Sequence, residues 1–272
     1  MRLDLHIHTN ASDGAWSPEK VVQGAARGGL DVIAIADHDT TAAVAAAQAV
    51  GGDHSIQVIP AIEVSSTVEG REVHVLGYFI DIEAPTLLAY TERAAHVRDD
   101  RMKEMIRRLE KDGVAVSFSE VEAAAGPDRV NIGRPHLARV LVDHGHASSV
   151  AGAFNSLIGD RHPAFVATGL LDPMQAVSLI LEAGGIPMWA HPPGDLVDSL
   201  LPRMLKAGLR GLEVYRPRYS RTDVLRFEGI CRSSGLLMSG GSDWHSPDYG
   251  VALGDFHVTA DEVENLLSEG GM

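Results

Sequence analysis

Short apolar runs alternate with longer helical patterns along most of the chain. Residues 30–36 are almost continuously apolar, which is typical of a strand buried on both faces of a sheet. Two helix starts are marked by Ser17-Pro18 and Asp172-Pro173, where a capping side chain precedes a proline at the first helical position. The alternation predicts an α/β fold in which helices connect the strands of a parallel sheet.

The pattern places these elements along the chain. Strands are predicted near residues 2–8, 31–36, 56–63, 72–79, 186–190, 210–214 and 236–240. Helices are predicted near residues 18–28, 40–50, 85–112, 172–183, 195–207, 221–233 and 260–268.

The repeat stops between about residues 100 and 165. A charged helix at 101–111 ends at Asp112-Gly113, and helical runs follow near 117–125, 134–144 and 148–158. No strand pattern of the barrel type occurs there. We therefore expect a barrel made of residues 1–99 and 166–272, with a small helical insert at 100–165 that caps the substrate.

Composition narrows the class of protein. Apolar residues make up 45% of the 272 and charged residues 22%, an ordinary globular mixture. The 23 basic and 37 acidic residues give a net charge of −14, which argues against a surface for duplex nucleic acid. Cys231 is the single cysteine, so neither a disulfide framework nor a cysteine zinc site is expected. Without a signal core or a long apolar run, we expect a cytoplasmic protein that does not enter membranes. The oligomeric state is left open.

Histidines and carboxylates gather at or near the ends of the predicted strands. His6 and His8 are two residues apart on a strand and so share one face, although two surface histidines would give the same pattern. The other candidate ligands are Asp13, His38, Glu63, His74, His191, Asp243 and His245. Nitrogen and oxygen ligands suit Mn, Fe or Zn, and nine are too many for one ion. Two to three divalent metal ions are therefore expected, with Asp37 and Asp39 as supporting or turn-forming residues.

Taken together, these motifs resemble the PHP (polymerase and histidinol phosphatase) family of metal-dependent phosphoesterases. The matching stretches are His6-Ile7-His8-Thr9, Ser12-Asp13-Gly14, Asp37-His38-Asp39-Thr40, Glu63, His74, Ala190-His191-Pro192 and Ser242-Asp243-Trp244-His245. The resemblance implies a distorted (β/α)₇ barrel and a trinuclear site. His6, His8, Glu63 and Asp243 would hold the first ion, and Glu63, His74 and His191 the second. Asp13, His38 and His245 would hold the third, although some relatives have His at the position of Asp13.

Arginines supply candidate phosphate contacts. Arg134 and His136 lie in the stretch Gly133-Arg134-Pro135-His136 of the insert, and relatives active on nucleotides carry a similar stretch. A guanidinium suits a phosphate by paired hydrogen bonds, although a solvated surface arginine is the simpler interpretation. Arg216 follows the sixth predicted strand, where relatives often have His. Arg218 and Arg221 lie in the same loop, which could equally offset an acidic surface.

The predicted reaction is attack on phosphorus by water that the metal ions activate, with no covalent enzyme intermediate. The resemblance implies nucleotide substrates, either 3′,5′-bisphosphonucleotides or short oligonucleotides with a 5′-phosphate. The alternatives are a histidinol-phosphate phosphatase, an amidohydrolase and a non-catalytic metal-binding PHP module. Many binuclear amidohydrolases need a carboxylated lysine on a strand, whereas Lys20, Lys103, Lys111 and Lys206 all lie in predicted helices.

Overall fold

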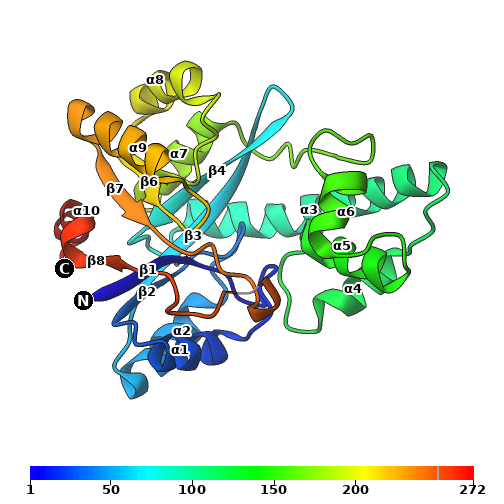
Figure 1. Ribbon diagram of the computed structural model, residues 1–272, viewed down its shortest axis with the longest axis horizontal. Helices are drawn as coiled ribbons and strands as arrows, with labels where there is room; N and C mark the ends of the chain where they lie inside the picture. Colours follow the sequence, from blue (N-terminus) through cyan, green and yellow to red (C-terminus); the bar gives the residue numbers. More distant parts are fainter. Residues whose placement is uncertain (250) are drawn as a thin grey trace.

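The computed structural model describes residues 1–249 and 251–272. The strands in these residues form one eight-stranded sheet. The order of the strands is β7-β6-β5-β4-β3-β2-β1-β8 (Figure 1). The strands are β1 (Arg2–Ile7), β2 (Val32–Ile35), β3 (Gln57–Val68), β4 (Arg71–Tyr78), β5 (Ile186–Trp189), β6 (Gly211–Tyr215), β7 (Leu237–Gly240) and β8 (Val258–Thr259). All seven predicted strands are present. The additional short strand β8 pairs antiparallel with β1.

The sheet curls into a nearly closed barrel. The segment after β7 returns to β1, where the Trp244 amide donates to the carbonyl of His6 at 3.3 Å. The His8 amide donates to the carbonyl of Trp244 at 2.9 Å. These two bonds join the last long strand to the first, so the predicted fold class, a distorted α/β barrel, is confirmed.

One strand runs against the predicted direction. β4 is antiparallel to both β3 and β5, so the sheet is not the uniformly parallel one that the alternation indicated. Only Glu69 and Gly70 connect β3 to β4, at φ 50° and 76°. Two residues suffice for a hairpin, whereas a parallel crossover needs about a dozen or more. β3 also continues to Val68, so Glu63 lies in the middle of its strand and not at the end.

Helices surround the barrel (Figure 1). They are α1 (Pro18–Arg27), α2 (Val44–Gly51), α3 (Pro85–Lys111), α7 (Pro173–Glu182), α8 (Val197–Ala207), α9 (Arg221–Ser234) and α10 (Glu264–Glu269). Alternate residues of β2 serve two cores. Ala34 packs with Met188 from across the barrel, whereas Ile33 packs with Val21 of α1 and Val44 of α2. The strand is therefore buried on both faces, as its sequence predicted.

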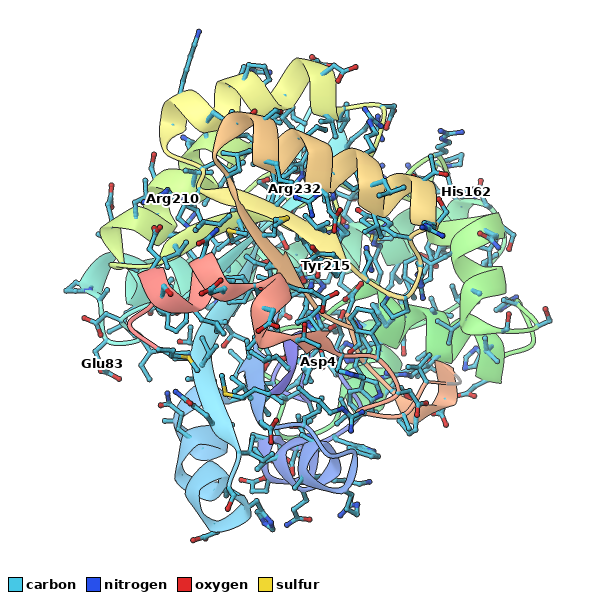
Figure 2. The ribbon with its side chains drawn as sticks, turned by 60° about the vertical axis from the view of Figure 1, so that its left-hand side comes forward. Asp4, Glu83, His162, Arg210, Tyr215 and Arg232 are labelled. Carbon is cyan, nitrogen blue, oxygen red and sulfur yellow. The ribbon has the colours of Figure 1, made fainter. Side chains whose placement is uncertain are left out.

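Helix α9 shows how the outer layer is attached. It lies beside β6, whose end is marked by Tyr215 in Figure 2, and Arg232 lies near the end of the helix. Cys231 is buried on the inner face of α9. The cytoplasmic location expected from this single cysteine stays a prediction. Within the described residues, no helix is long and apolar enough to cross a membrane.

Residues 118–158 form a group of helices beside the barrel (Figure 1). They are α4 (Phe118–Ala125), α5 (Arg134–Asp143), α6 (Val150–Ala153) and the π-helical turn η2 (Phe154–Ile158). Their apolar side chains pack with the second half of α3 in a core of their own. The amides of Val130 and Asn131 donate to the carbonyl of Ala11, at 2.8 and 3.0 Å. These bonds attach the helices to the loop that carries Asp13.

Candidate metal centre

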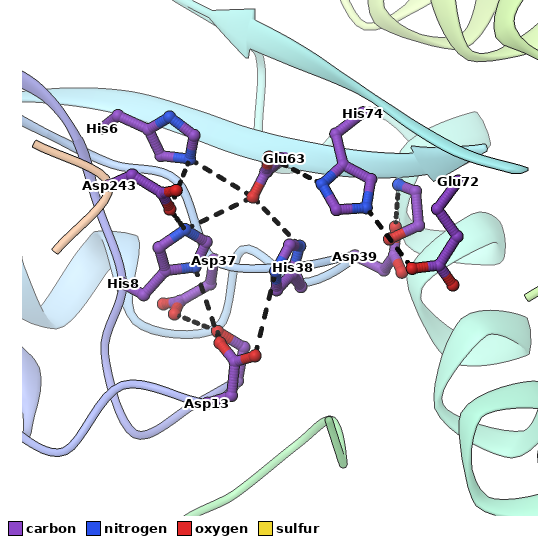
Figure 3. Close-up of polar contacts among 12 residues, drawn as sticks. His6, His8, Asp13, Asp37, His38, Asp39, Glu63, Glu72, His74 and Asp243 are labelled. Carbon is purple, nitrogen blue, oxygen red and sulfur yellow. Dashed lines mark hydrogen bonds and ion pairs between the residues drawn. The ribbon is translucent and has the colours of Figure 1, made fainter. Parts of the chain in front are cut away.

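Glu63 lies at the centre of a buried group of histidines (Figure 3). Its Oε2 atom lies 3.2 Å from Nε2 of His6, 3.3 Å from Nε2 of His8 and 3.0 Å from Nδ1 of His38. Its Oε1 atom lies 3.0 Å from Nδ1 of His74 and 2.9 Å from Nε2 of His191. One carboxylate therefore faces imidazoles from five different positions in the sequence.

Two aspartates complete the group. Oδ1 of Asp13 lies 3.4 Å from Nε2 of His245, and Oδ2 lies 3.8 Å from Nε2 of His38. Oδ1 of Asp243 lies 3.7 Å from Nε2 of His6 and 3.4 Å from Nε2 of His8. The structure thus brings together the nine side chains expected as ligands: His6, His8, Asp13, His38, Glu63, His74, His191, Asp243 and His245.

Three sets of these side chains have donor atoms close enough together to hold an ion, within 4.8 Å of one another. The sets are His8, Asp13, His38 and His245; His6, His8 and Asp243; and His38, Glu63 and His74. They differ from the three sets that the resemblance implied: His8 and His38 each occur in two sets, Glu63 occurs in only one, and His191 occurs in none of them. The assignment of each residue to a particular ion stays a prediction.

Several buried polar atoms in this group have no hydrogen-bond partner among the described residues. They are Nε2 of His6, both ring nitrogens of His8, Nδ1 of His38 and Oε2 of Glu63. An unsatisfied buried polar atom costs free energy, and here such atoms converge on common points. Nitrogen and oxygen donors at these points suit divalent Mn, Fe or Zn. The residues present therefore fit a group of divalent cations.

The carboxylates of the group are held in their ionised form. Burial by itself raises the pKa of Asp13, but His38 and His245 outweigh burial and hold this pKa well below its usual range. For Glu63, burial is likewise outweighed by His38, His6 and His74, and its pKa is also well below the ordinary value. The ionised carboxylate is the form that binds a divalent cation, and a histidine that binds one must be neutral.

Asp37 and Asp39 support the neighbouring loops. Asp37 accepts hydrogen bonds from the amide and hydroxyl of Thr9, at 2.7 and 2.6 Å, and from the hydroxyl of Ser12 at 2.6 Å. These bonds fix the loop just before Asp13. Asp39 accepts from the amide of Ser65 at 2.6 Å and from Nε of Arg98 at 2.7 Å.

Backbone strain marks three of the strand ends. Asp39, His191 and Asp243 have φ values of 53°, 30° and 54°, and none of them is glycine. Such a conformation costs of order 1–3 kcal/mol per residue and is concentrated at functional sites. The three residues follow β2, β5 and β7, so the left-handed conformations lie where these strands lead into the cluster.

The sequence did not single out Glu213 of β6. Its Oε1 lies 2.8 Å from Nδ1 of His6, and its Oε2 accepts from the His191 amide at 2.7 Å. Both carboxylate oxygens are therefore used to orient candidate ligands. The available signal was one carboxylate inside the apolar strand Gly211–Tyr215. Asp4 was also missed, and it accepts from the amide and hydroxyl of Ser242 at 2.8 and 2.6 Å.

A cavity of about 890 Å³ joins this cluster to the helices beside the barrel. Arg134 of α5 lines it and donates to Glu72 at 2.7 Å and to Asp160 at 2.6 Å. Arg216 also lines it and donates to Oδ2 of Asp243 at 2.7 Å. Both arginines predicted to contact phosphate thus reach the same space. Arg218 is an exposed member of the lining.

His136 is placed differently from the two arginines. It is buried, and its Nδ1 accepts a hydrogen bond from the amide of Gly133 at 3.0 Å. It stands apart from the side chains that line the cavity and secures the first turn of α5. A Cβ atom on Gly133 would lie 2.8 Å from Oδ2 of Asp13, so only glycine lets α5 approach this closely. A contact of His136 with phosphate stays a prediction.

Known proteins resemble this chain in sequence and in fold. The sequence pattern of the PHP domain matches residues 4–96. A 5′-3′ exoribonuclease of Haemophilus influenzae is 31% identical over 258 residues, which are 93% of each chain. The chain belongs to the PHP family. A second relative, a 3′,5′-nucleoside bisphosphate phosphatase of Chromobacterium violaceum, is 32% identical over 254 residues, 91% of this chain and 88% of that one.

Further comparisons support the same enzyme class. A phosphoribosyl 1,2-cyclic phosphate 1,2-diphosphodiesterase of Eggerthella lenta is 33% identical over 269 residues, 94% of this chain and 99% of that one. A Bifidobacterium adolescentis protein assigned as a metal-dependent phosphoesterase superposes with a TM-score of 0.89 at 30% identity, covering 98% and 96% of the two chains. The prediction of a metal-dependent phosphoesterase is confirmed. All four lysines lie in helices, so no lysine is available on a strand for the carboxylated lysine that many binuclear amidohydrolases need.

Proposed function

We propose that this PHP protein hydrolyses phosphate from nucleotides that carry both a 3′- and a 5′-phosphate, or from short oligonucleotides with a 5′-phosphate. The observation that carries the proposal is one cavity that is lined by seven of the nine cluster residues and by Arg134 and Arg216. A bisphosphorylated nucleotide has two anionic groups, and the cavity offers it a cation-binding cluster and two guanidinium groups. Two relatives are named as a 5′-3′ exoribonuclease and a 3′,5′-nucleoside bisphosphate phosphatase, and these names support such substrates.

The cluster is proposed to hold two or three divalent ions of Mn, Fe or Zn. His6, His8, Glu63 and Asp243 would bind the first, Glu63, His74 and His191 the second, and Asp13, His38 and His245 the third. When bound, such ions lower the pKa of water and neutralise charge on the reacting phosphate. The orphaned ring nitrogens of His6, His8 and His38 support this assignment.

Arg216 is suited to the reacting phosphate because it is tied to the cluster itself. Asp243 uses Oδ2 to accept from Arg216, while Oδ1 faces His6 and His8. Nε of Arg216 is buried and has no partner within the described part of the chain. Asp243 can thus bind a cation through one oxygen and position a donor for phosphate through the other.

Arg134 is proposed to bind the second phosphate. Its guanidinium is held by Glu72 and Asp160, and the side chain is mostly buried. A fixed donor loses little freedom when an anion arrives, which favours selective binding. Residues 100–165 would then act as the substrate-capping insert on a barrel made of residues 1–99 and 166–272.

A comparison of substrates tests the proposal. Purified protein, loaded in turn with Mn, Fe or Zn, is assayed on adenosine 3′,5′-bisphosphate, a 5′-phosphorylated trinucleotide, histidinol phosphate and a phosphoribosyl 1,2-cyclic phosphate. We expect the highest kcat/KM on the first two. A higher value on histidinol phosphate would make the chain a histidinol-phosphate phosphatase. A higher value on the cyclic diester would give it the activity for which the relative from Eggerthella lenta is named. That activity is the second candidate, because the match covers 99% of that relative.

A further inference from the structure

The cavity changes its chemistry from one end to the other. Around the cluster, its wall is formed by carboxylates, imidazoles and guanidinium groups. The part contributed by α6 and η2 carries no charged side chain among the described residues that line it. It consists of Ser149, Val150, Ala151, Phe154 and Asn155. An uncharged wall of aromatic, aliphatic and amide groups contributes little to binding phosphate, but it suits an uncharged planar group.

Phe154 is the aromatic member of this wall, and its neighbours fix its position. Cζ of Arg134 lies 5.3 Å from the centre of the Phe154 ring, within the range of a cation–π contact. Arg134 is itself anchored by Glu72 and Asp160, so the ring packs against a stationary group.

The backbone around Phe154 is equally constrained. A Cβ atom on Gly159 would lie 2.4 Å from the carbonyl oxygen of Phe154, so the close return of the chain needs glycine. Nε2 of His162, at the edge of these helices in Figure 2, contacts the carbonyl of Asn155 at 2.8 Å. The π-helical turn that carries Phe154 is a form often found at functional sites.

We propose that this wall of α6 and η2 is a subsite for the base of the nucleotide, with Phe154 as its stacking platform. The inference rests on the proposed function and extends it, because this wall consists of residues other than the nine cluster side chains and the two arginines. The sugar and the two phosphates run from Phe154 past Arg134 to the cluster. Stacking accepts every base, since each has a π-face, and the amide of Asn155 faces the same space.

The test compares two variants on two substrates. Phe154→Leu keeps an apolar side chain but removes the ring. Phe165→Leu is the matched control, because the Phe165 ring also packs on Arg134, at 5.1 Å, but lies outside the residues that line the cavity. The substrates are adenosine 3′,5′-bisphosphate and the same sugar bisphosphate without a base. KM and kcat are measured for each pair with metal-loaded protein.

We expect Phe154→Leu to raise KM for the nucleotide about tenfold, as loss of a stacking aromatic does, and to leave kcat unchanged. Phe154→Leu should leave KM for the substrate without a base unchanged. Phe165→Leu should leave KM and kcat unchanged for both substrates. Equal losses on both substrates, or equal effects of the two variants, would overturn the subsite and assign Phe154 to the support of Arg134. An unchanged KM would overturn it as well. If the wild-type protein were inactive on the nucleotide, the proposed function would be refuted too. If the wild type were active and Phe154→Leu had the same KM, the subsite alone would be refuted.

Discussion

Glu213 and His6 form a fully buried pair in which Oε1 of the carboxylate lies 2.8 Å from Nδ1 of the ring. Because Glu213 occupies Nδ1, the other nitrogen of His6 is left to face Glu63 and Asp243. The carboxylate thus selects the tautomer of His6 and fixes the direction of its free lone pair. The same carboxylate accepts from the backbone of His191, so one side chain on β6 orients two candidate ligands.

We predict that Glu213→Gln lowers the affinity for the metal ions by roughly 10- to 100-fold, as loss of a group that orients a ligand does. Calorimetric titration of metal-free protein with Mn or Zn measures the effect. Glu228→Gln is the control, because Glu228 accepts from Tyr215 and pairs with Arg232 on the outer layer. Equal affinities in Glu213→Gln and wild type would show that His6 needs no such orientation.

Glu63→Gln should disturb more than one metal ion, because the carboxylate faces five imidazoles. Asp13→Ala should mainly remove one ion, since Asp13 contacts only the side of the cluster formed by His8, His38 and His245. Elemental analysis of protein purified without chelator and resupplied with metal gives the content per chain. Loss of the same single ion in both variants would contradict the proposed ligand sets.

Arg134→Ala should lower kcat/KM on a bisphosphorylated nucleotide by at least roughly 10-fold, since a charge-assisted hydrogen bond contributes about 1.5–3 kcal/mol. Metal content should stay unchanged. Arg129→Ala is a suitable control, because Arg129 lies just before α5 and pairs with Glu122 and Asp99 away from the main cavity. A generic aryl phosphate is assayed in parallel. Equal losses on both substrates would mean that Arg134 holds the reacting phosphate and not the second one.

Arg98→Ala should destabilise the fold by about 3–5 kcal/mol, because it leaves the buried carboxylate of Asp39 without its counter-charge. Chemical denaturation monitored by circular dichroism measures the free energy of unfolding. Arg107→Ala removes an exposed partner of Glu104 on the same helix α3 and should leave the midpoint unchanged. If the two variants unfolded at the same denaturant concentration, the pair of Arg98 and Asp39 would have no special weight in stability.

Local sequence patterns predicted much of this molecule. The strands could be placed because buried strands are short apolar runs, and the paired ligands His6 and His8 because alternate residues of a strand share a face. The direction of β4 could not be placed in this way. The apolar run predicted a strand that ends at residue 63, whereas β3 continues to Val68 and the chain turns at Glu69 and Gly70 in left-handed conformations.

Long-range partners were also beyond the sequence. Arg134 was recognisable as a candidate for phosphate, but its ion pair with Glu72 joins residues 62 positions apart. Glu213 is 207 positions from His6, and a carboxylate inside a strand does not show which group it will meet. The nine candidate ligands could be proposed because their residue types converge on one chemistry. The residues that orient them have no such common property.

The hydrogen bond from Nδ2 of Asn131 to the carbonyl of His38, at 2.7 Å, links the helices beside the barrel to the loop that would hold a cation. Together with the bonds from Val130 and Asn131 to Ala11, it couples the position of these helices to the geometry of the cluster. Whatever tightens the loop must favour the docked arrangement of the helices by the same factor, because such coupling is reciprocal. Cation binding at this loop would therefore stabilise the attachment of the helices, and slower hydrogen exchange in α5 would report the occupancy of a site to which α5 contributes no ligand.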